Sequence, residues 1–211
     1  MIDLQAIANA VIAGRADETG QLVRAALDEG VDASTVLESG LIAGMAVVGA
    51  RFRANEIFVP EVLVAARAMK AGLELLEPIF AAAGVEPTGT VVLGTVKGDI
   101  HDIGKNLVSM MLRGAGFRVV DLGVNVPLQK FLDGIAQHKP EIVGMSALLT
   151  TTMGQMPINV KALRDAGYTG KILVGGAPVT AEFAVKAGAD AYGASAPDAV
   201  EQALRLVGAE P

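Results

Sequence analysis

The sequence predicts an α/β protein in which an N-terminal four-helix bundle is followed by a flavodoxin-like (Rossmann-like) domain with a five-stranded parallel sheet. Two observations carry this prediction. Apolar residues recur every three or four positions up to about residue 86, whereas short continuous apolar runs separated by helical stretches follow from residue 90. The change of period falls in the segment 83–89, which contains two Gly and one Pro. We therefore expect two domains, residues 1–86 and residues 88–211.

The first domain has helix signals and no strand signals. Ser34 can cap a helix that runs to about Phe52, and Pro60 suits the first position of the next helix, which Pro78 is expected to end. The most apolar early stretch, residues 40–50, is shorter than the roughly 20 residues of a membrane span, so we interpret it as a core helix and expect no membrane partner. Four short helices of this kind predict a small antiparallel bundle.

The second domain contains five strand-like runs separated by helical stretches. Continuous apolar strands that alternate with helices predict a parallel sheet covered on both faces, whose ligands bind beyond the carboxyl ends of the strands. The expected strands are residues 90–96, 117–122, 142–148, 171–175 and 191–193.

Composition excludes several classes of function. The chain of 211 residues has no Cys and only two His, which excludes disulfides, zinc ribbons and Cys nucleophiles. Its net charge of −6, without a dense basic cluster, and its 4% of aromatic residues argue against nucleic acid as a partner. No basic segment precedes an apolar one at the N-terminus, so we expect no secretory signal and a cytoplasmic protein.

A polar loop bounded by glycines follows the first expected strand and is the strongest candidate for a site. Its sequence over residues 94–106 is GTVKGDIHDIGKN. A phosphate-binding P-loop needs four residues between its glycines and a Ser or Thr after the Lys, but five residues separate Gly98 from Gly104, and Asn106 takes the place of the Ser or Thr. The G-x-G-x-x-G dinucleotide fingerprint is absent there too, so we reject nucleotide binding at this loop.

Asp99 and His101 in this loop have the pattern of a metal ligand with a supporting carboxylate. A carboxylate next to an imidazole fixes its tautomer and raises its basicity, although a solvent-exposed loop histidine beside an acid has the same pattern. Ser146 near the end of the third strand and the pair Gly175 and Gly176 at the end of the fourth lie at the same sheet edge. Each has an ordinary explanation, a helix cap or a tight turn, but together they predict a slot for a long, flat group.

Three motifs together resemble, in order and position, the cobalamin-binding module of methionine synthase and of the corrinoid proteins of anaerobic methyltransferase systems. They are D-x-H-x-x-G at residues 99–104, S-x-L at residues 146–148 and G-G at residues 175–176. The segments 48–52, 57–60 and 65–69 are similar to the cap domain of the same family. The resemblance therefore covers nearly the whole chain and implies a methyl-face cap followed by a cobalamin-binding domain.

The resemblance implies a role for each matching position. His101 matches the lower axial ligand of cobalt, Asp99 the carboxylate bonded to its imidazole, and Thr152 the hydroxyl of the ligand relay, which is a Ser in methionine synthase. The detached tail of the corrinoid would enter the sheet slot past Ser146. The implied cofactor contacts are Gly98, Asp99, His101, Asp102, Ile103, Gly104, Ser146, Leu148, Thr150, Gly175, Gly176, Gly193 and Ala194, with Phe52, Val59 and Val62 of the cap over the methyl-bearing face.

The implied function is that of a corrinoid protein in one-carbon metabolism that carries a methyl group on cobalt, cycling between Co(I) and methyl-Co(III). It would be a subunit of a multi-component methyltransferase system and not catalytic alone. Its implied partners are a barrel-type methyl-donor methyltransferase, an acceptor methyltransferase that uses tetrahydrofolate or a thiol, and a reductive activase. Methylamines, methanol, betaines and aryl methyl ethers all remain open as donors.

Two other classes share parts of this pattern. A cobalamin-based sensor joins a similar cap and cobalamin fold to a DNA-reading element, for which we see no room before the bundle. The small subunit of an adenosylcobalamin mutase shares the D-x-H-x-x-G loop but needs no methyl-face cap. Asp121, Asn125 and Pro127 could contact the corrin side chains or only form a turn, and His138 is expected at the surface near a helix C-terminus.

Overall fold

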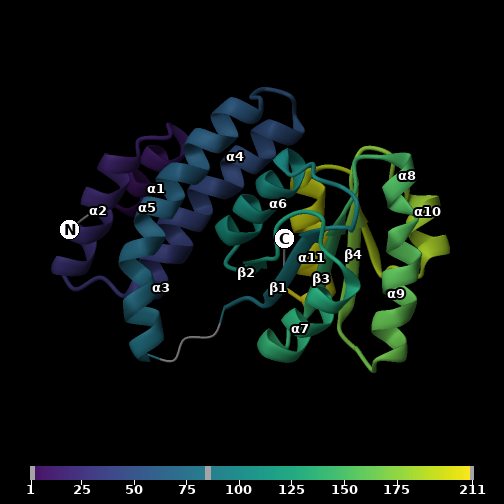
Figure 1. The fold of residues 1–211 in the computed structure, drawn as a ribbon. Helices are drawn as coiled ribbons and strands as arrows, with labels where there is room; N and C mark the ends of the chain where they lie inside the picture. Colours follow the sequence, from purple (N-terminus) through teal and green to yellow (C-terminus); the bar gives the residue numbers. More distant parts are fainter. Residues whose placement is uncertain (1–2, 84–86, 210–211) are drawn as a thin grey trace. The chain divides into compact units, whose positions relative to one another are not determined.

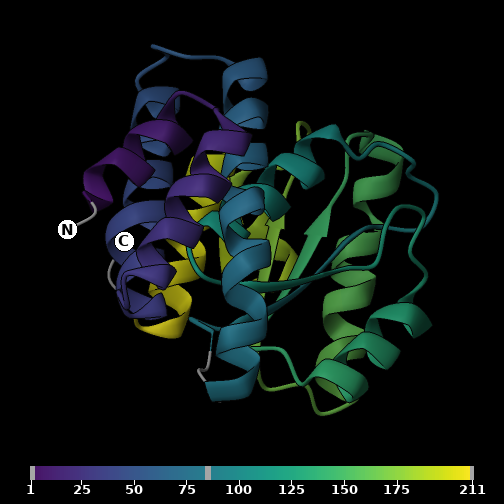
Figure 2. The same cartoon turned by 90° about the vertical axis from the view of Figure 1, so that its left-hand side faces the viewer.

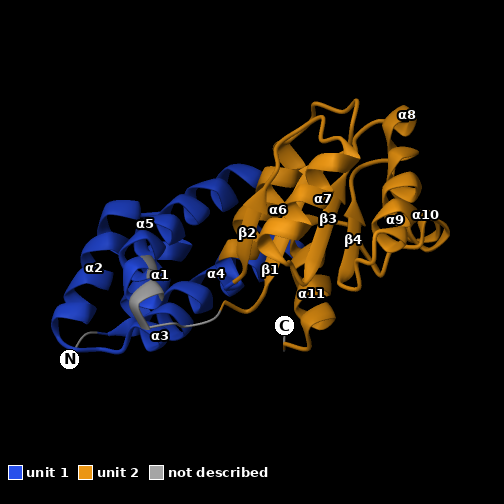
Figure 3. Cartoon of the chain, turned by 60° about the horizontal axis from the view of Figure 1, so that its bottom comes forward, with its two compact units in different colours: residues 1–86, 114–116 blue, residues 87–113, 117–211 orange. Residues whose placement is uncertain are grey.

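The computed structural model describes residues 3–83 and 87–209. The chain divides into two compact units, residues 1–86 with 114–116 and residues 87–113 with 117–211 (Figure 3). The expected domain boundary adjoins residues 84–86, which lie outside the described residues. The helices of the first unit are α1 (Leu4–Ile12), α2 (Ala16–Asp28), α3 (Ala33–Thr35), the π-helix η1 (Val36–Ile42), α4 (Ala43–Arg53) and α5 (Val59–Ala83).

The first unit is a helical bundle held by apolar side chains at helical spacing. In it α1 packs against α2, η1 and α4, and α2 packs against α5. Ile7, Val11, Leu41 and Leu76 are completely buried. Gly40 permits a close approach between helices, because a Cβ atom there would lie 3.0 Å from Ile7 Cγ2. The predicted bundle is therefore present.

Two sequence-based expectations for helix ends are wrong. Asp32, not Ser34, caps the third helical segment, since its carboxylate accepts a hydrogen bond of 3.1 Å from the Thr35 amide and the helix begins at Ala33. Pro78 does not end α5, which continues to Ala83. Pro78 lies on the exposed side of α5, where loss of one backbone bond is tolerated while buried neighbours such as Leu76 keep the helix packed.

The segments α3, η1 and α4 form one continuous helical stretch, Ala33–Arg53, which by length and composition alone is apolar enough to cross a membrane. Within the protein, 44% of its most apolar window is buried. Val36, Leu41 and Val48 from this stretch are buried and form part of the core of the bundle.

The second unit is a five-stranded sheet in the order β2-β1-β3-β4-β5 with every pair parallel, which confirms the predicted fold class. Helices cover both faces of the sheet (Figures 1 and 2). The strands are β1 (Thr90–Thr95), β2 (Arg118–Asp121), β3 (Ile142–Ser146), β4 (Lys171–Gly175) and β5 (Ala191–Gly193). The helices are α6 (Ile103–Gly114), α7 (Leu128–His138), α8 (Thr150–Met153), α9 (Gln155–Asp165), α10 (Ala181–Ala187) and α11 (Ala196–Val207).

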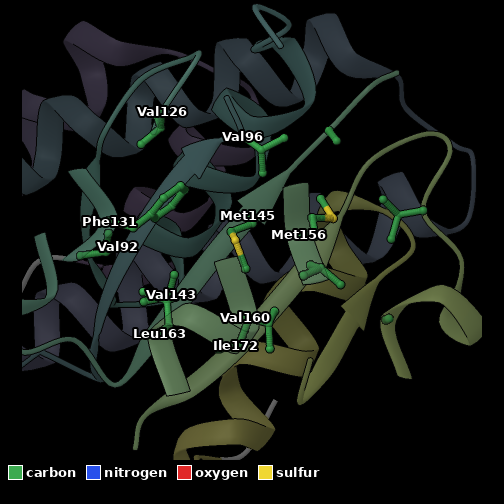
Figure 4. Close-up of a cluster of buried hydrophobic side chains, with 14 of the residues drawn as sticks. Val92, Val96, Val126, Phe131, Val143, Met145, Met156, Val160, Leu163 and Ile172 are labelled. Carbon is green, nitrogen blue, oxygen red and sulfur yellow. The ribbon is translucent and has the colours of Figure 1, made fainter. Parts of the chain in front are cut away.

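Alternate strand residues build the core on one face of the sheet. Val92, Val143 and Ile172 from three neighbouring strands pack with Phe131 of α7 and Leu163 of α9 (Figure 4). The strands β1, β2 and β3 end one or two residues earlier than expected. Beyond β1 the ladder is reduced to a single bridge between Val96 and Val126, because the chain turns there into the loops at the carboxyl edge.

Candidate functional site

The carboxyl ends of four parallel strands place small or hydroxyl-bearing residues in one row. Thr95 of β1 pairs with Ser146 of β3, Ser146 with Gly175 of β4, and Gly175 with Gly193 of β5. The loop that contains Asp99 starts immediately after this row. The predicted site is thus brought together by the register of the sheet, at the edge where ligands of this fold class bind.

Asp99 is a completely buried carboxylate at the centre of this edge. Its Oδ1 atom accepts bonds from the backbone amide of His101 (3.1 Å) and lies 2.7 Å from Nδ1 of the same residue. Its Oδ2 atom accepts a bond of 2.8 Å from the Leu148 amide and one of 2.7 Å from the Thr152 hydroxyl. The carboxylate therefore ties the loop after β1 to the segment after β3.

These bonds set the charge of Asp99. Burial by itself raises the pKa of Asp99, but the hydrogen bonds from the Thr152 hydroxyl, the Leu148 amide and His101 outweigh it and hold the pKa well below its usual range. The carboxylate is therefore ionised at neutral pH and can only accept hydrogen bonds.

An ionised Asp99 decides the tautomer of His101. Because the carboxylate cannot donate, the proton of the neutral imidazole must lie on Nδ1, which leaves the lone pair on Nε2. The His101 side chain is 45% exposed, and its other ring nitrogen has no hydrogen bond among the described residues. The arrangement is that of a metal-ligating histidine backed by a carboxylate.

Thr152 reaches Asp99 from the short helix α8. Its side chain is buried, and its hydroxyl lies 2.7 Å from Asp99 Oδ2 and 2.9 Å from the Leu149 carbonyl oxygen. Since a hydroxyl has one proton and the charged oxygen is the stronger acceptor, the proton goes to Asp99. The three residues of the predicted ligand relay are thus in one hydrogen-bonded chain.

Asn125, which the sequence places only in a turn or a corrin contact, clamps the loop after β1. Its side-chain oxygen accepts a hydrogen bond of 2.8 Å from the Gly98 backbone amide. The backbone amide of Asn125 donates a hydrogen bond of 2.8 Å to the Asp99 carbonyl oxygen. Asn125 has a φ of 52°. Asn tolerates this left-handed conformation better than most residues, which explains its presence at this position.

A buried ion pair lies beside the loop. Lys105 has a side chain only 2% exposed, and its Nζ atom lies 2.5 Å from Asp121 Oδ2 and 2.7 Å from the Asn106 side-chain oxygen. Asn106 in turn donates a bond of 2.9 Å to Asp102. Asp121 therefore joins the network that holds the N-terminus of α6, a role the sequence alone does not indicate.

Exposed apolar side chains lie in the loop that contains His101 and in the segment that follows β3 at the same edge of the sheet. Ile100 and Ile103 flank the histidine in the loop, and Leu148 and Leu149 follow Ser146. All four are more than 40% exposed. Such side chains on a polar loop are suited to contact an apolar ligand.

The predicted glycines have different surroundings. A Cβ atom at Gly104 would meet no atom within 4 Å, so the chain leaves open space there. At Gly176, where φ is 126°, a Cβ would lie 1.9 Å from the Ala147 carbonyl oxygen, and at Gly175 it would lie 2.9 Å from the Gly193 oxygen. A Cβ at Gly193 would lie 2.8 Å from the Ala199 side chain. Close packing within the unit therefore explains the glycines at the ends of β4 and β5, and the slot for a long, flat group stays a prediction.

The remaining predicted cofactor contacts form no hydrogen bond with this network among the described residues. Thr150 is exposed at the start of α8, and Ala194 is exposed after β5. In the first unit, Phe52 of α4 and Val59 of α5 are half-buried and Val62 is completely buried. The shielding role that the resemblance gives these three residues stays a prediction. His138 is the last residue of α7, as expected.

Thr95 is a site residue that the sequence-based prediction missed. It is almost completely buried, and its hydroxyl lies 2.9 Å from both the His101 carbonyl oxygen and the Ser146 hydroxyl. The available signal was a hydroxyl residue in the strand that leads into the D-x-H loop. Its pairing with Ser146 depends on strand register and could not be obtained from the motif.

Comparison with known proteins identifies the family of the chain. Models of the B12 binding domain match residues 89–203 and residues 3–77. The chain is 48% identical over 181 residues to trimethylamine corrinoid protein 2 of Methanosarcina acetivorans, which covers 84% of this chain and 83% of that protein. It is 40% identical over 210 residues to a corrinoid protein of Desulfitobacterium hafniense, which covers 97% of both.

A solved structure matches as well. The crystal structure of the methanol:cobalamin methyltransferase complex MtaBC from Methanosarcina barkeri contains a chain that is 33% identical, with a TM-score of 0.88, over 97% of this chain and 79% of that chain. The cofactor predicted from sequence, cobalamin or a related corrinoid, is thereby confirmed. The chain belongs to the B12-binding corrinoid proteins, the methyl carriers of anaerobic methyltransferase systems.

Proposed function

We propose that this protein carries a methyl group on a corrinoid whose cobalt is bound from below by Nε2 of His101. When bound, the corrinoid supplies a cobalt centre that can accept a methyl group from one enzyme and give it to another, cycling between Co(I) and methylated Co(III). The observation that carries the proposal is the 2.7 Å contact between the buried Asp99 and His101 Nδ1, because it leaves the Nε2 lone pair available to a metal.

The donor set fits such a cofactor. Among the residues that the structure describes, no group of three or more His, Asp or Glu side chains could hold a metal ion by itself. A single imidazole is sufficient when the cofactor brings its own equatorial nitrogens. The exposed Ile100, Ile103 and Leu148 offer apolar surface for a large ring, and the open space beside Gly104 leaves room for a bulky group.

The residues of the chain control the imidazole. Asp99 holds the ring through Nδ1, which directs Nε2 away from the carboxylate. Thr152 and the Leu148 amide keep the carboxylate in place. These contacts fix the orientation of the ring whose Nε2 atom would hold the metal.

Electron paramagnetic resonance tests the axial ligand. The protein is loaded with cobalamin, reduced to the Co(II) state and prepared with ordinary or ¹⁵N-labelled histidine. Coordination by His101 predicts that labelling changes the axial nitrogen splitting from a triplet to a doublet. His101→Ala should lose the label-dependent splitting while retaining much of the corrinoid, and His138→Ala should match the unmodified protein. A triplet that ignores the label would overturn the proposal.

We also propose the partners. Relatives at 44–48% identity are named trimethylamine corrinoid proteins, so a methylated amine is the donor class we favour over methanol, whose complex contains a 33% identical chain. The donor enzyme would be a barrel-type methyltransferase, the acceptor enzyme would use tetrahydrofolate or a thiol, and a reductive activase would restore oxidised cobalt. Affinity purification of the corrinoid-loaded protein from its native cells, followed by methylation assays with trimethylamine and methanol, tests the donor class.

A further inference from the structure

Two hydroxyl groups connect the end of β3 to the histidine loop. Thr95 and Ser146 are paired in the parallel ladder, and their Oγ atoms lie 2.9 Å apart. Thr95 Oγ also lies 2.9 Å from the carbonyl oxygen of His101. The Thr95 side chain is only 1% exposed, so water cannot replace either partner.

Counting protons fixes the direction of this chain. A carbonyl oxygen can only accept, so Thr95 must donate its single hydroxyl proton to His101. The Thr95–Ser146 contact then needs the Ser146 proton, and Ser146 is the donor. In this arrangement Ser146 offers only lone pairs to any further partner.

A ligand at Ser146 would therefore affect the loop in one of two ways. A ligand group that donates to Ser146 leaves the chain of hydroxyls intact. A group that accepts the Ser146 proton leaves Thr95 with two acceptors and one proton, so the Ser146 and His101 bonds compete. Because both hydroxyls are held in register by backbone pairing, neither can avoid the competition by moving away.

We propose that Thr95 is a positioning residue that couples the group bound at Ser146 to the backbone of the axial ligand His101. The inference rests on the proposed function and on the position past Ser146 that the sequence resemblance implies for the corrinoid tail. A benzimidazole tail presents an acceptor nitrogen, so its insertion weakens the Thr95–His101 bond. A corrinoid without a tail base leaves that bond in place.

The first test needs no corrinoid. In the cofactor-free protein, the ¹³C chemical shift of the His101 carbonyl reports the hydrogen bond that it accepts. Thr95→Val, which replaces the hydroxyl by a methyl group of similar size, should move this signal upfield, and Thr95→Ser should not. Thr90→Val is the matched control, since Thr90 lies in the same strand and its side chain has no hydrogen bond to the loop among the residues that the structure describes. A signal unaffected by Thr95→Val would overturn the proposal.

The second test measures the coupling between the group bound at Ser146 and the axial ligand His101. Protein loaded with cobalamin or with cobinamide, which lacks the tail base, is titrated with cyanide to displace the histidine. Loss of one hydrogen bond predicts that Thr95→Val makes displacement about fivefold easier with cobinamide and changes it less with cobalamin. Equal changes with both corrinoids would overturn the coupling.

Failure of the proposed function is distinguishable from failure of this inference. If His101→Ala leaves the spectrum of the loaded protein unchanged, the axial assignment is wrong, but the carbonyl signal still tests the Thr95–His101 bond. If His101 is the ligand and the carbonyl signal does not respond, the inference alone is wrong. Should Thr95→Val fail to fold, Thr95→Ala removes the same hydroxyl and should also move the carbonyl signal upfield, whereas Ser146→Ala leaves the Thr95 proton on the His101 carbonyl and should not.

Discussion

The hydroxyl of Thr152 donates a hydrogen bond of 2.7 Å to the buried carboxylate of Asp99, which precedes it by 53 residues. The bond joins the loop after β1 to helix α8 and helps to keep Asp99 ionised. A buried charge depends on such bonds, because water cannot solvate it.

Thr152→Val should therefore destabilise the protein much more than Thr152→Ser. Loss of a hydrogen bond to a buried charge costs about 1.5–3 kcal/mol, whereas Ser keeps the hydroxyl. The free energy of unfolding in urea at pH 7 measures the difference. Thr151→Val on the exposed side of the same helix is the control and should stay within about 0.5 kcal/mol of the unmodified protein. Equal losses for the Val and Ser variants at position 152 would show that the hydroxyl is unimportant.

Asn125→Gly should loosen the loop at Gly98 without straining the backbone. Gly accepts the φ of 52° but lacks the oxygen that binds the Gly98 amide, so exchange of that amide proton should be about fivefold faster. Asn125→Ala should cost a further 1–2 kcal/mol of unfolding free energy, roughly the penalty of a side chain in the left-handed region. Hydrogen exchange followed by NMR measures the first effect.

Asn55→Gly is the matched control for that experiment, because Asn55 also has a positive φ, of 59°, but lies in the first unit. It should leave exchange at Gly98 unchanged. An unchanged Gly98 rate in Asn125→Gly would contradict the clamp.

Replacing Asp121 should lower the free energy of unfolding more than replacing Lys105. Asp121→Ala leaves a buried cation whose one remaining partner among the described residues is Asn106, at a cost of about 3 kcal/mol. Lys105→Met leaves a carboxylate that still reaches water. The double variant should be more stable than Asp121→Ala alone. Urea unfolding of the three variants tests this order, and Asp165→Ala in the exposed Lys161–Asp165 pair should change stability by less than about 0.5 kcal/mol. An Asp121→Ala variant as stable as Lys105→Met would contradict the interpretation.

Tyr168 should make the protein sensitive to alkali. Burial raises the pKa of Tyr168, and the positive charge of Arg164 opposes this only in part. Since an unfolded Tyr ionises near pH 10 while the folded one stays protonated, the stabilising contribution is complete below about pH 10 and is lost as the pH rises above it, by up to about 1.4 kcal/mol per pH unit.

Tyr168→Phe tests this dependence. At pH 7 the variant should be about 1 kcal/mol less stable, because the hydroxyl donates a bond of 3.1 Å to the Pro140 carbonyl. Between pH 10 and pH 11 it should lose less stability than the unmodified protein, as measured by urea unfolding. Parallel stability curves for the two proteins would mean that the phenol titrates alike in the folded and unfolded states.

The sequence was sufficient for the elements whose signals are local. Strand and helix periods, the order of the five strands in the chain and the D-x-H-x-x-G loop are all properties of short segments, and the fold class derived from them is correct. Helix ends were less predictable. Asp32 and Ser34 are both good caps by residue type, and whether Pro78 ends a helix depends on which side of α5 faces the core.

The contacts of the site also differ in whether they join residues close together or far apart in the sequence. Asp99 and His101 are two residues apart, so their pairing could be expected from the sequence alone. The clamp by Asn125 and the hydroxyl pair of Thr95 and Ser146 join residues 27 and 51 positions apart, and no local pattern encodes them. Only the register of the parallel strands brings these groups within hydrogen-bond distance, because register depends on how whole strands pack against their covering helices.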